Sequence, residues 1–267
     1  MKTLIVPISG GKDSQVVLSL AIKTGRAIVC VHQNTGYDHP DTYAQIDAME
    51  KFYGVKVEHT ASGGMFAFLE KSGYFPNSAA RGCTQILKQL PFANWLKKNQ
   101  FTHVNAEIWF GMRSDESRDR ANKYGGITDD DEFTLADVAV YYRRSKKLAE
   151  TIGRISVKLP IVEWNTKQIF DYIATENAPL NPLYGRGHSR VGCYPCLLAR
   201  KSEWQNVGKD PTGREHIEKM IALEDKWKAE GNHRKFIKVH RVWDVRNFLD
   251  GKDVRELAEE ECGYCSI

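Results

Sequence analysis

Short apolar runs alternate with amphipathic helical stretches from the start of the chain, and few fold classes are built in this way. Residues 3–8 are a β-branched apolar run that ends at a glycine-rich turn. Residues 13–24 then carry apolar side chains at helical spacing, and residues 27–33 and 40–54 repeat the sequence of apolar run and helix. Strands that alternate with helices favour a parallel sheet. We therefore expect an α/β fold with a doubly wound, mostly parallel sheet flanked by helices, followed by a helical C-terminal lobe.

Later residues continue the pattern with one interruption. Residues 55–60 and 102–112 predict further strands, and residues 166–177 predict an amphipathic helix. Residues 122–138 carry glycines and four consecutive acids, so we expect a surface loop there. No internal repeat or low-complexity tract suggests another architecture.

The composition is that of a globular protein, with 42% hydrophobic and 27% charged residues. The formal net charge of +4 suits an anionic substrate but is too small to indicate a nucleic-acid partner, which it leaves open. No stretch approaches the roughly 20 apolar residues that span a bilayer, and the N-terminus lacks the pattern of a signal peptide. We expect a soluble cytoplasmic protein without a membrane partner.

The turn after the first expected strand, SGGKDS at residues 9–14, has the chemistry of an anion site. Between a strand and a helix, successive backbone N–H groups and the positive end of the helix dipole can face one anion. Lys12 adds a mobile positive charge. For Asp13 two roles stay open, a Mg²⁺ or water-mediated ligand of a pyrophosphate and a helix N-cap. We assign nucleotide binding to Ser9, Gly10, Gly11, Lys12, Asp13 and Ser14.

The same turn resembles the PP-loop of the adenine nucleotide alpha-hydrolase superfamily, and its spacing differs from that of a Walker A loop. Later stretches resemble the phosphoadenosine phosphosulfate reductase family in that family's order. Residues 34–43, NTGYDHPDTY, resemble its D-T-G-x-x-x-P-E-T segment, with Asn34 and Asp41 in place of the commoner acids. Residues 111–121 resemble G-x-R-x-x-E-S-x-x-R-A, and residues 160–196 carry N-P-L-Y and G-C-x-x-C. The resemblance implies further nucleotide contacts at Asn34, Thr35, Gly36, Arg113, Glu116, Ser117, Arg118 and Arg120.

The arginines of the 111–121 stretch also have a chemical reason to bind an anion. They follow the end of an expected strand, on a polar loop. Arg113, Arg118 and Arg120 there can form a bidentate trap for phosphate or sulfate. We expect Glu116 to orient one of them.

Beyond Cys196 the sequence changes character. It becomes charged, with expected helices at residues 214–231 and 252–261. The matched motifs end at the same point. We therefore place a PP-loop nucleotide-binding α/β domain at residues 1–196 and a helical C-terminal lobe with a cysteine-containing tail at residues 197–267.

The chain has six cysteines, and four of them form two C-x-x-C pairs, which indicates metal or redox chemistry in a reducing compartment. Cys30 lies in an apolar run, where we expect core packing. Relatives with a 4Fe–4S cluster have two adjacent cysteines before a distant C-x-x-C, and this chain has Gly82 at the first position of that pair. The resemblance therefore implies three cluster ligands, Cys83, Cys193 and Cys196, with a fourth supplied elsewhere or missing.

The tail EECGYCSI resembles the E-C-G-L-H ending of sulfonucleotide reductases, whose cysteine attacks the sulfate sulfur. The resemblance implies that Cys262 is a nucleophile or sulfur carrier, and that Cys265 resolves it or completes the cluster. An alternative needs no cluster. Both C-x-x-C pairs together, Cys193, Cys196, Cys262 and Cys265, have the spacing of a tetrahedral zinc site.

Three functions stay open. In the first, adenylyl sulfate or phosphoadenylyl sulfate is reduced to sulfite through a cysteine thiolate, with a thioredoxin- or glutathione-type reductant. In the second, which the intact loop favours, ATP with Mg²⁺ is cleaved to AMP and pyrophosphate, and an adenylated acceptor takes sulfur from a cysteine or cluster, as in DNA phosphorothioation or tRNA thiolation. In the third, the chain is a non-catalytic nucleotide-binding module. We assign catalytic roles to Cys262 and Lys12 and expect a homo-oligomer.

Overall fold

A computed structural model describes residues 1–77, 79–199 and 201–233 of the chain. Its centre is a six-stranded sheet with the strand order β3-β2-β1-β4-β6-β5. Within these residues five strands run parallel, and the short β5 pairs antiparallel with β6. The expected doubly wound, mostly parallel sheet is confirmed. The strands are β1 (Thr3–Ile8), β2 (Ile28–His32), β3 (Val57–His59), β4 (Ala106–Trp109), β5 (Phe133–Thr134) and β6 (Ser156–Lys158).

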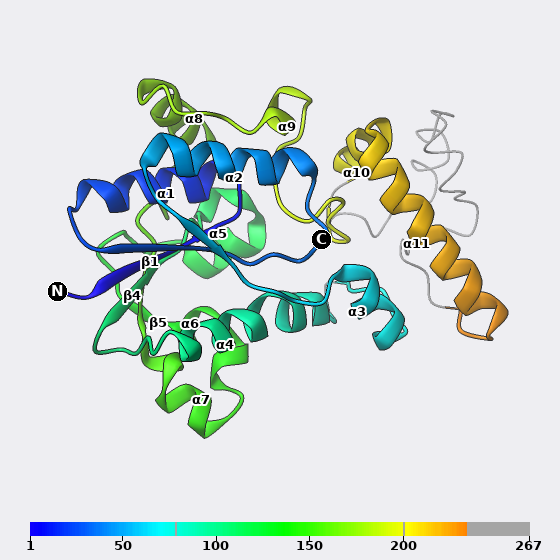
Figure 1. The fold of residues 1–267 in the computed structure, drawn as a ribbon, viewed down its shortest axis with the longest axis horizontal. Helices are drawn as coiled ribbons and strands as arrows, with labels where there is room; N and C mark the ends of the chain where they lie inside the picture. Colours follow the sequence, from blue (N-terminus) through cyan, green and yellow to red (C-terminus); the bar gives the residue numbers. More distant parts are fainter. Residues whose placement is uncertain (78, 200, 234–267) are drawn as a thin grey trace.

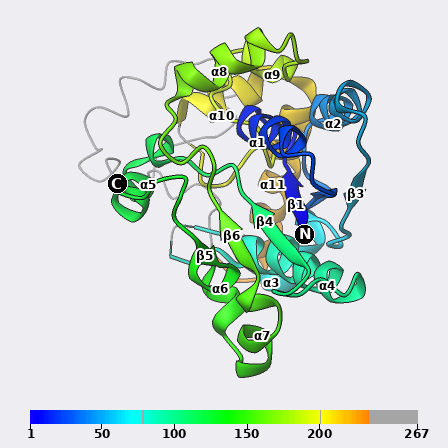
Figure 2. The same ribbon diagram turned by 90° about the vertical axis from the view of Figure 1, so that its left-hand side faces the viewer.

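Helices cover both faces of this sheet (Figures 1 and 2). α1, α2 and α8 lie on one face, α4, α6 and α7 lie on the other, and α10 and α11 lie beyond the carboxyl end of β1. The described helices are α1 (Lys12–Lys23), α2 (Pro40–Tyr53), α3 (Met65–Ser72), α4 (Leu90–Lys98), α5 (Arg118–Tyr124), α6 (Leu135–Val138), α7 (Lys146–Glu150), α8 (Thr166–Thr175), α9 (Pro182–Gly185), α10 (Lys201–Lys209) and α11 (Pro211–Ala229), with the π-helix η1 (Thr84–Gln89) and the 3-10 helices η2 (Ser114–Glu116), η3 (Val140–Arg143) and η4 (Ile152–Arg154).

The strand order creates a switch point between β1 and β4. From β1 the sheet continues to β2 and β3 on one side, and to β4 and β6 on the other. In open α/β sheets, ligands bind beyond the carboxyl ends of the strands at such a point. β1 ends directly before the turn at residues 9–14, and β4 ends shortly before the motif at residues 111–121. The fold therefore brings these two predicted nucleotide motifs to the same place.

Three apolar clusters hold the layers together. One packs the sheet against α1, α2 and α8 and includes Val16 and Ile169, and a second packs it against α4 and α6. The third joins α3, α10 and α11 and includes Trp227. Trp164 and Tyr172 lie against the first cluster. Removal of this apolar surface from water is the main force that holds the helices to the sheet.

The expected surface loop at residues 122–138 is wrong at both ends. Residues 122–124 complete α5, and Tyr124 is buried. Residues 133–134 form β5 and residues 135–138 form α6. Leu135 is fully buried in the cluster shared with α4. The run of acids at 129–132 dominates the sequence pattern, whereas the apolar residues after it add an edge strand and a helix to the sheet.

The expected C-terminal helices have different outcomes. Residues 214–229 are helical as part of α11, whereas residues 252–261 lie outside the described residues. Among the helices that the structure describes, none is long and apolar enough to cross a membrane.

Candidate functional site

The predicted phosphate loop is a tight turn between β1 and α1. Gly10 has a φ of +69°, and a Cβ at this position would lie 2.7 Å from Thr42 Cγ2, so glycine is required here. The carbonyl of Gly10 accepts a hydrogen bond from Asn181 Nδ2 at 3.0 Å. Gly11 is the N-cap residue of α1. The N-cap role considered for Asp13 is therefore wrong.

The backbone donors of the loop have hydroxyl partners within the protein. Ser9 N–H donates to Ser14 Oγ at 3.1 Å, and Gly11 N–H donates to Ser9 Oγ at 3.3 Å. Lys12 N–H donates to the hydroxyl of Tyr184 at 2.9 Å. Phosphate oxygens accept hydrogen bonds as these hydroxyl oxygens do. The hydroxyl groups thus occupy acceptor positions that an anion would take on the loop.

Lys12 is buried, with 4% of its surface exposed to solvent. Its ammonium donates to Ser189 O at 3.2 Å and lies 3.4 Å from Asp13 Oδ2. It also lies 5.1 Å from the ring centroid of Tyr184. Segment 179–189 therefore covers the predicted catalytic lysine.

Asp13 faces the start of the 111–121 motif. Arg113 Nε donates to Asp13 Oδ1 at 2.6 Å, and Arg113 is 2% exposed. Arg113 also donates to Asp115 Oδ2 at 3.2 Å, to Trp164 O at 3.1 Å and to Thr166 Oγ1 at 3.3 Å. The arginine predicted to trap an anion is instead the residue that fixes Asp13.

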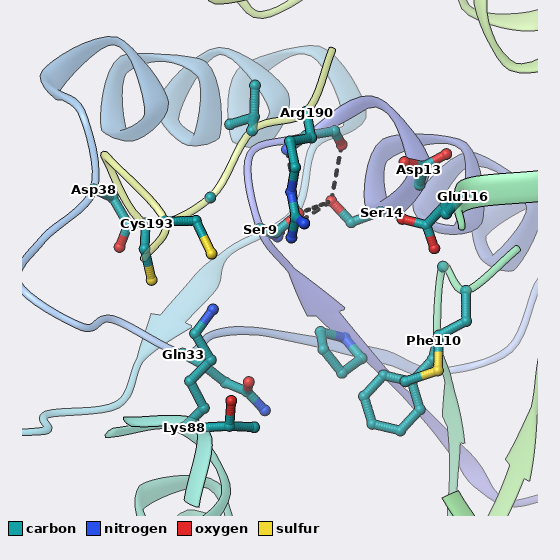
Figure 3. A pocket seen from close by; sticks show the side chains of 18 of the residues that line it. Ser9, Asp13, Ser14, Gln33, Asp38, Lys88, Phe110, Glu116, Arg190 and Cys193 are labelled. Atoms are coloured by element: carbon teal, nitrogen blue, oxygen red, sulfur yellow. Dashed lines mark hydrogen bonds between the residues drawn. The ribbon is translucent and has the colours of Figure 1, made fainter. Parts of the chain in front are cut away.

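A cavity of about 460 Å³ opens beside the loop, next to the carboxyl ends of β1 and β2 and the loop after β4. Figure 3 shows Asp13 and Glu116 at one end of it and Cys193 with Asp38 at the other, with Ser9 between them. The cavity therefore joins the predicted nucleotide loop to the predicted metal ligands. The predicted site residues that line it are Ser9, Gly11, Asp13, Ser14, Glu116, Arg120, Cys193 and Cys196.

The other predicted residues lie around this cavity or beyond the described part of the chain. Asn34 Oδ1 accepts hydrogen bonds from Gly36 N–H at 2.8 Å and from the Tyr43 hydroxyl at 2.9 Å, so Asn34 shapes its turn. Ser117 caps α5 by accepting from Arg120 N–H at 3.3 Å, and Arg120 pairs with Glu116 as expected. Arg118 begins α5. Cys262 and Cys265 lie outside the described residues. The predicted site residues that are described but do not line the cavity are Gly10, Lys12, Asn34, Thr35, Gly36, Arg113, Ser117 and Cys83.

Three further cations line the cavity, Arg81, Lys88 and Arg190. Within the described residues their side chains form no hydrogen bond or ion pair. Figure 3 shows Arg190 beside Ser9, with Lys88 on the opposite side of the cavity. Unpaired cations around a concave site attract an anion. The sequence motifs did not predict these three residues as ligands. The sequence feature that could have indicated them is their position near the predicted metal ligands, since Arg190 stands three residues before Cys193.

The cysteine end of the cavity is both buried and charged. Asp38 and Cys193 form an isolated antiparallel bridge, and Thr35 Oγ1 lies 3.7 Å from Cys193 Sγ. Burial raises the pKa of the Cys193 thiol, and the charge of Lys88 acts against this. A Cys193 thiolate in turn raises the pKa of Lys88. Lys88 therefore supplies positive charge next to this sulfur.

Three predicted cluster ligands, Cys83, Cys193 and Cys196, lie within the described residues. The charge of Cys196 acts on both Cys83 and Cys193, and Cys83 stands directly before η1, a rare helix type that is frequent at functional sites. Within the described residues, no group of three or more His, Cys, Asp or Glu is placed to hold one metal ion. An iron–sulfur cluster is larger than one ion and takes four thiolates.

His32, at the end of β2, also lines the cavity. Its Nδ1 lies 2.8 Å from Ile8 O and therefore carries the proton. Its Nε2 is buried and has no hydrogen-bond partner among the described residues. Burial lowers the pKa of His32, so the ring is neutral and Nε2 is an acceptor at neutral pH.

Comparison with known proteins identifies the family. Residues 3–199, more than two thirds of the chain, match the phosphoadenosine phosphosulfate reductase domain. The chain belongs to this family. An adenosine 5'-phosphosulfate reductase of Deinococcus radiodurans is 26% identical over 221 residues, which cover 79% of this chain and 75% of that reductase.

Other relatives are longer or more distant. An uncharacterized protein of Methanocaldococcus jannaschii is 27% identical over 210 residues, 78% of this chain, but the match covers 39% of its own length. The chain thus spans about two fifths of that relative. A crystal structure of a phosphoadenylyl-sulfate reductase from Candida auris superposes with a TM-score of 0.51 at 16% identity, covering 73% of this chain and 83% of that one. This last similarity supports the fold.

Proposed function

We propose that this family member binds an adenylyl sulfonucleotide and reduces it to sulfite through a cysteine thiol. The observation that carries the proposal is the cavity with Arg81, Lys88 and Arg190, whose side chains have no partner within the described residues. It runs from the nucleotide loop to Cys193. A nucleotide that ends in a phosphosulfate has the charge for such a site.

The two ends of the cavity have different tasks in this proposal. Arg190 lies beside the loop at residues 9–14 and holds the phosphosulfate from that side. Lys88 and Arg81 hold the sulfate at the cysteine end. Arginine matches the geometry of phosphate and sulfate oxygens in a bidentate way, and lysine adds a point charge.

The reaction then proceeds in two thiol steps. The thiolate of Cys262 attacks the sulfate sulfur, a sulfur–sulfur bond forms, and the bond from sulfur to the bridging oxygen breaks. The nucleotide leaves with the electron pair, as AMP from adenylyl sulfate or as adenosine 3′,5′-bisphosphate from phosphoadenylyl sulfate. A thiol of a thioredoxin- or glutathione-type reductant then attacks Cys262 Sγ, sulfite leaves, and a disulfide remains. The thiols supply both electrons. This role of Cys262 rests on the resemblance of the tail, since the residue lies outside the description.

The cysteines of the cavity are the proposed cluster ligands. Cys83, Cys193 and Cys196 would hold three corners of a 4Fe–4S cluster, and Cys265 is the proposed fourth ligand. When bound, the cluster supplies a redox-active iron–sulfur centre. Lys88 balances negative charge at this end, because its pKa responds most strongly to Cys193. The zinc alternative would use Cys265 with Cys262 and the C-x-x-C pair of the cavity.

A second candidate function is cleavage of ATP between the α- and β-phosphates, with transfer of sulfur to an adenylated acceptor. The observation that favours it is Asp13, a carboxylate that lines the cavity at the first turn of α1. Held by Arg113, it is placed to bind Mg²⁺ directly or through water. In this case Lys12 would move from Ser189 to the pyrophosphate.

Competitive binding separates the two candidates. ATP with Mg²⁺, adenylyl sulfate and phosphoadenylyl sulfate are titrated into anaerobically purified protein. We expect a sulfonucleotide to bind at least tenfold more tightly than ATP, which is about 1.4 kcal/mol. The opposite order would overturn the reductase proposal in favour of ATP cleavage.

Turnover tests the proposed nucleophile. Wild-type protein with a thiol reductant should release sulfite and the matching nucleotide from the sulfonucleotide that binds, AMP from adenylyl sulfate or adenosine 3′,5′-bisphosphate from phosphoadenylyl sulfate. Cys262→Ser should release neither, whereas Cys30→Ala, a matched change at a buried cysteine of β2, should keep the activity. Full sulfite release by Cys262→Ser would exclude the proposed attack.

A further inference from the structure

The segment that leads into Arg190 is held by a carboxylate from α10. Glu203 is 6% exposed. It accepts a hydrogen bond from Ser189 N–H at 2.7 Å and another from Ser189 Oγ. It also lies 3.0 Å from His188 Nδ1, which must donate because an ionised carboxylate only accepts. Three donors from two adjacent residues therefore converge on Glu203.

The same segment touches both ends of the cavity. Ser189 O accepts from Lys12 Nζ at 3.2 Å, on the nucleotide loop. His188 Nε2 lies 3.3 Å from the hydroxyl of Tyr194, which stands between the two cysteines of the C-x-x-C pair. The carboxylate thus orders the chain between the loop and the cysteines.

Arg190 depends on this order. Its side chain lines the cavity and forms no hydrogen bond or ion pair with the described residues, so no polar contact of its own fixes its direction. Its backbone directly follows Ser189, whose N–H, hydroxyl and carbonyl are all engaged. The backbone from which the Arg190 side chain extends is therefore positioned by Ser189 and, through it, by Glu203.

Glu203 itself is not suited to touch the anion. It borders the cavity, but Ser189 occupies one carboxylate oxygen and His188 the other. A carboxylate and a sulfate of like charge also repel each other. The residue can help to bind an anion only through the groups that it holds.

We propose that Glu203 is a positioning residue for the sulfonucleotide, which sets Arg190 against the phosphosulfate by fixing Ser189. This inference rests on the proposed function, because it takes the phosphosulfate as the ligand of Arg190. It adds a charged residue of α10 to the proposed site.

The test is a double-mutant cycle on binding of adenylyl sulfate. Glu203→Gln keeps the shape but replaces one acceptor oxygen with an NH₂ group that faces a donor. Loss of a hydrogen bond to a charged group predicts that Glu203→Gln raises the Kd for adenylyl sulfate by about tenfold or more. Arg190→Ala should do the same, and Glu203→Gln should add nothing further in the Arg190→Ala background. Adenosine, which has no anionic group, should bind both variants like wild type.

Two controls keep the test independent of folding. Glu215→Gln, at an exposed residue of α11 that pairs with Lys219, should leave the affinity unchanged. Ser189→Ala removes a single hydroxyl donor and should weaken adenylyl sulfate less than Glu203→Gln does, again only when Arg190 is present. If Glu203→Gln misfolds, Ser189→Ala carries the same test.

The outcomes separate this inference from the proposed function. A wild-type protein that binds no sulfonucleotide overturns the proposed function. If wild type binds it and Arg190→Ala weakens binding, but Glu203→Gln and Ser189→Ala do not, the positioning role alone is overturned. The positioning role is also contradicted if the losses of affinity from Glu203→Gln and Arg190→Ala multiply in the double variant. It is likewise contradicted if the variants lose affinity for adenosine equally. Either result indicates a general structural effect.

Discussion

Arg113 Nε lies 2.6 Å from Asp13 Oδ1, and this contact ties the loop after β1 to the loop after β4 across the switch point of the sheet. Both residues belong to motifs that predict nucleotide contacts. In the structure Arg113 is 2% exposed, and its guanidinium N–H groups donate to other groups of the protein. The motif therefore contributes rigidity to the site, and the unpaired cations of the cavity come from elsewhere.

Loss of Arg113 should destabilise the fold. Arg113→Ala leaves Asp13 without its main partner, and removal of one partner from a buried pair costs about 3–5 kcal/mol of unfolding free energy. Denaturant unfolding at neutral pH measures this loss of unfolding free energy. Lys167→Ala, at an exposed pair with Asp171, is the control and should change stability by less than about 0.5 kcal/mol. Equal effects of the two substitutions would contradict the structural role of Arg113.

Gly10 should tolerate substitution worse than a glycine of the same backbone conformation in open space. Gly10 and Gly25 have φ values of +69° and +66°. A Cβ at Gly25 meets nothing within 4 Å, whereas one at Gly10 lies 2.7 Å from Thr42 Cγ2. Gly25→Ala should cost about 1–2 kcal/mol from backbone strain alone. Gly10→Ala should lower the unfolding free energy by about 1–3 kcal/mol more than Gly25→Ala does, because of overpacking. Both losses are measured by denaturant unfolding, and equal losses would argue against a tight loop.

These cases show what the sequence predicts well and what it does not. The glycine turn at 9–14 is a local pattern between a strand and a helix, so its conformation follows from neighbouring residues. The directions of Lys12 and Arg113 depend on partners 177 and 51 positions away, Ser189 and Trp164, which no local pattern reveals. Both side chains turn inward for that reason. Arg190 stands close to a C-x-x-C pair in the sequence, but its place beside the loop at residues 9–14 follows only from the fold.

The cations of the cavity should control nucleotide affinity. Lys88→Ala and Arg81→Ala should each weaken sulfonucleotide binding by about tenfold, as expected for a hydrogen bond to a charged group. Titration calorimetry at low and at high salt should show a smaller salt dependence in each variant than in wild type, because one charge is missing. Lys97→Ala, on the exposed part of α4, is the matched control. Wild-type affinity in Lys88→Ala would place the anion elsewhere.

Glu203 should make stability depend on pH in the acid range. Burial alone raises the pKa of Glu203, but the hydrogen bonds from Ser189 and His188 prevail and hold it below the ordinary value of 4.5. The unfolded chain therefore takes up this proton at higher pH than the folded chain does. The stabilisation by the carboxylate is complete above about pH 4.5 and is lost as the pH falls through the folded pKa. The difference in unfolding free energy between wild type and Glu203→Gln should thus shrink below pH 4.5, and a constant difference from pH 7 to pH 3 would contradict an ionised Glu203.

The metal content should identify the cysteine site. Anaerobically purified wild type should contain about four iron and four acid-labile sulfide per chain if a 4Fe–4S cluster is bound. Cys83→Ser, Cys193→Ser and Cys196→Ser should each lose most of both, because each removes one of the proposed cluster ligands. Cys30→Ala should keep the cluster, since burial raises the pKa of that thiol to about 12 and holds it protonated inside β2. One zinc per chain with no sulfide, unchanged in Cys83→Ser and lost in Cys193→Ser, would assign the site to the two C-x-x-C pairs instead.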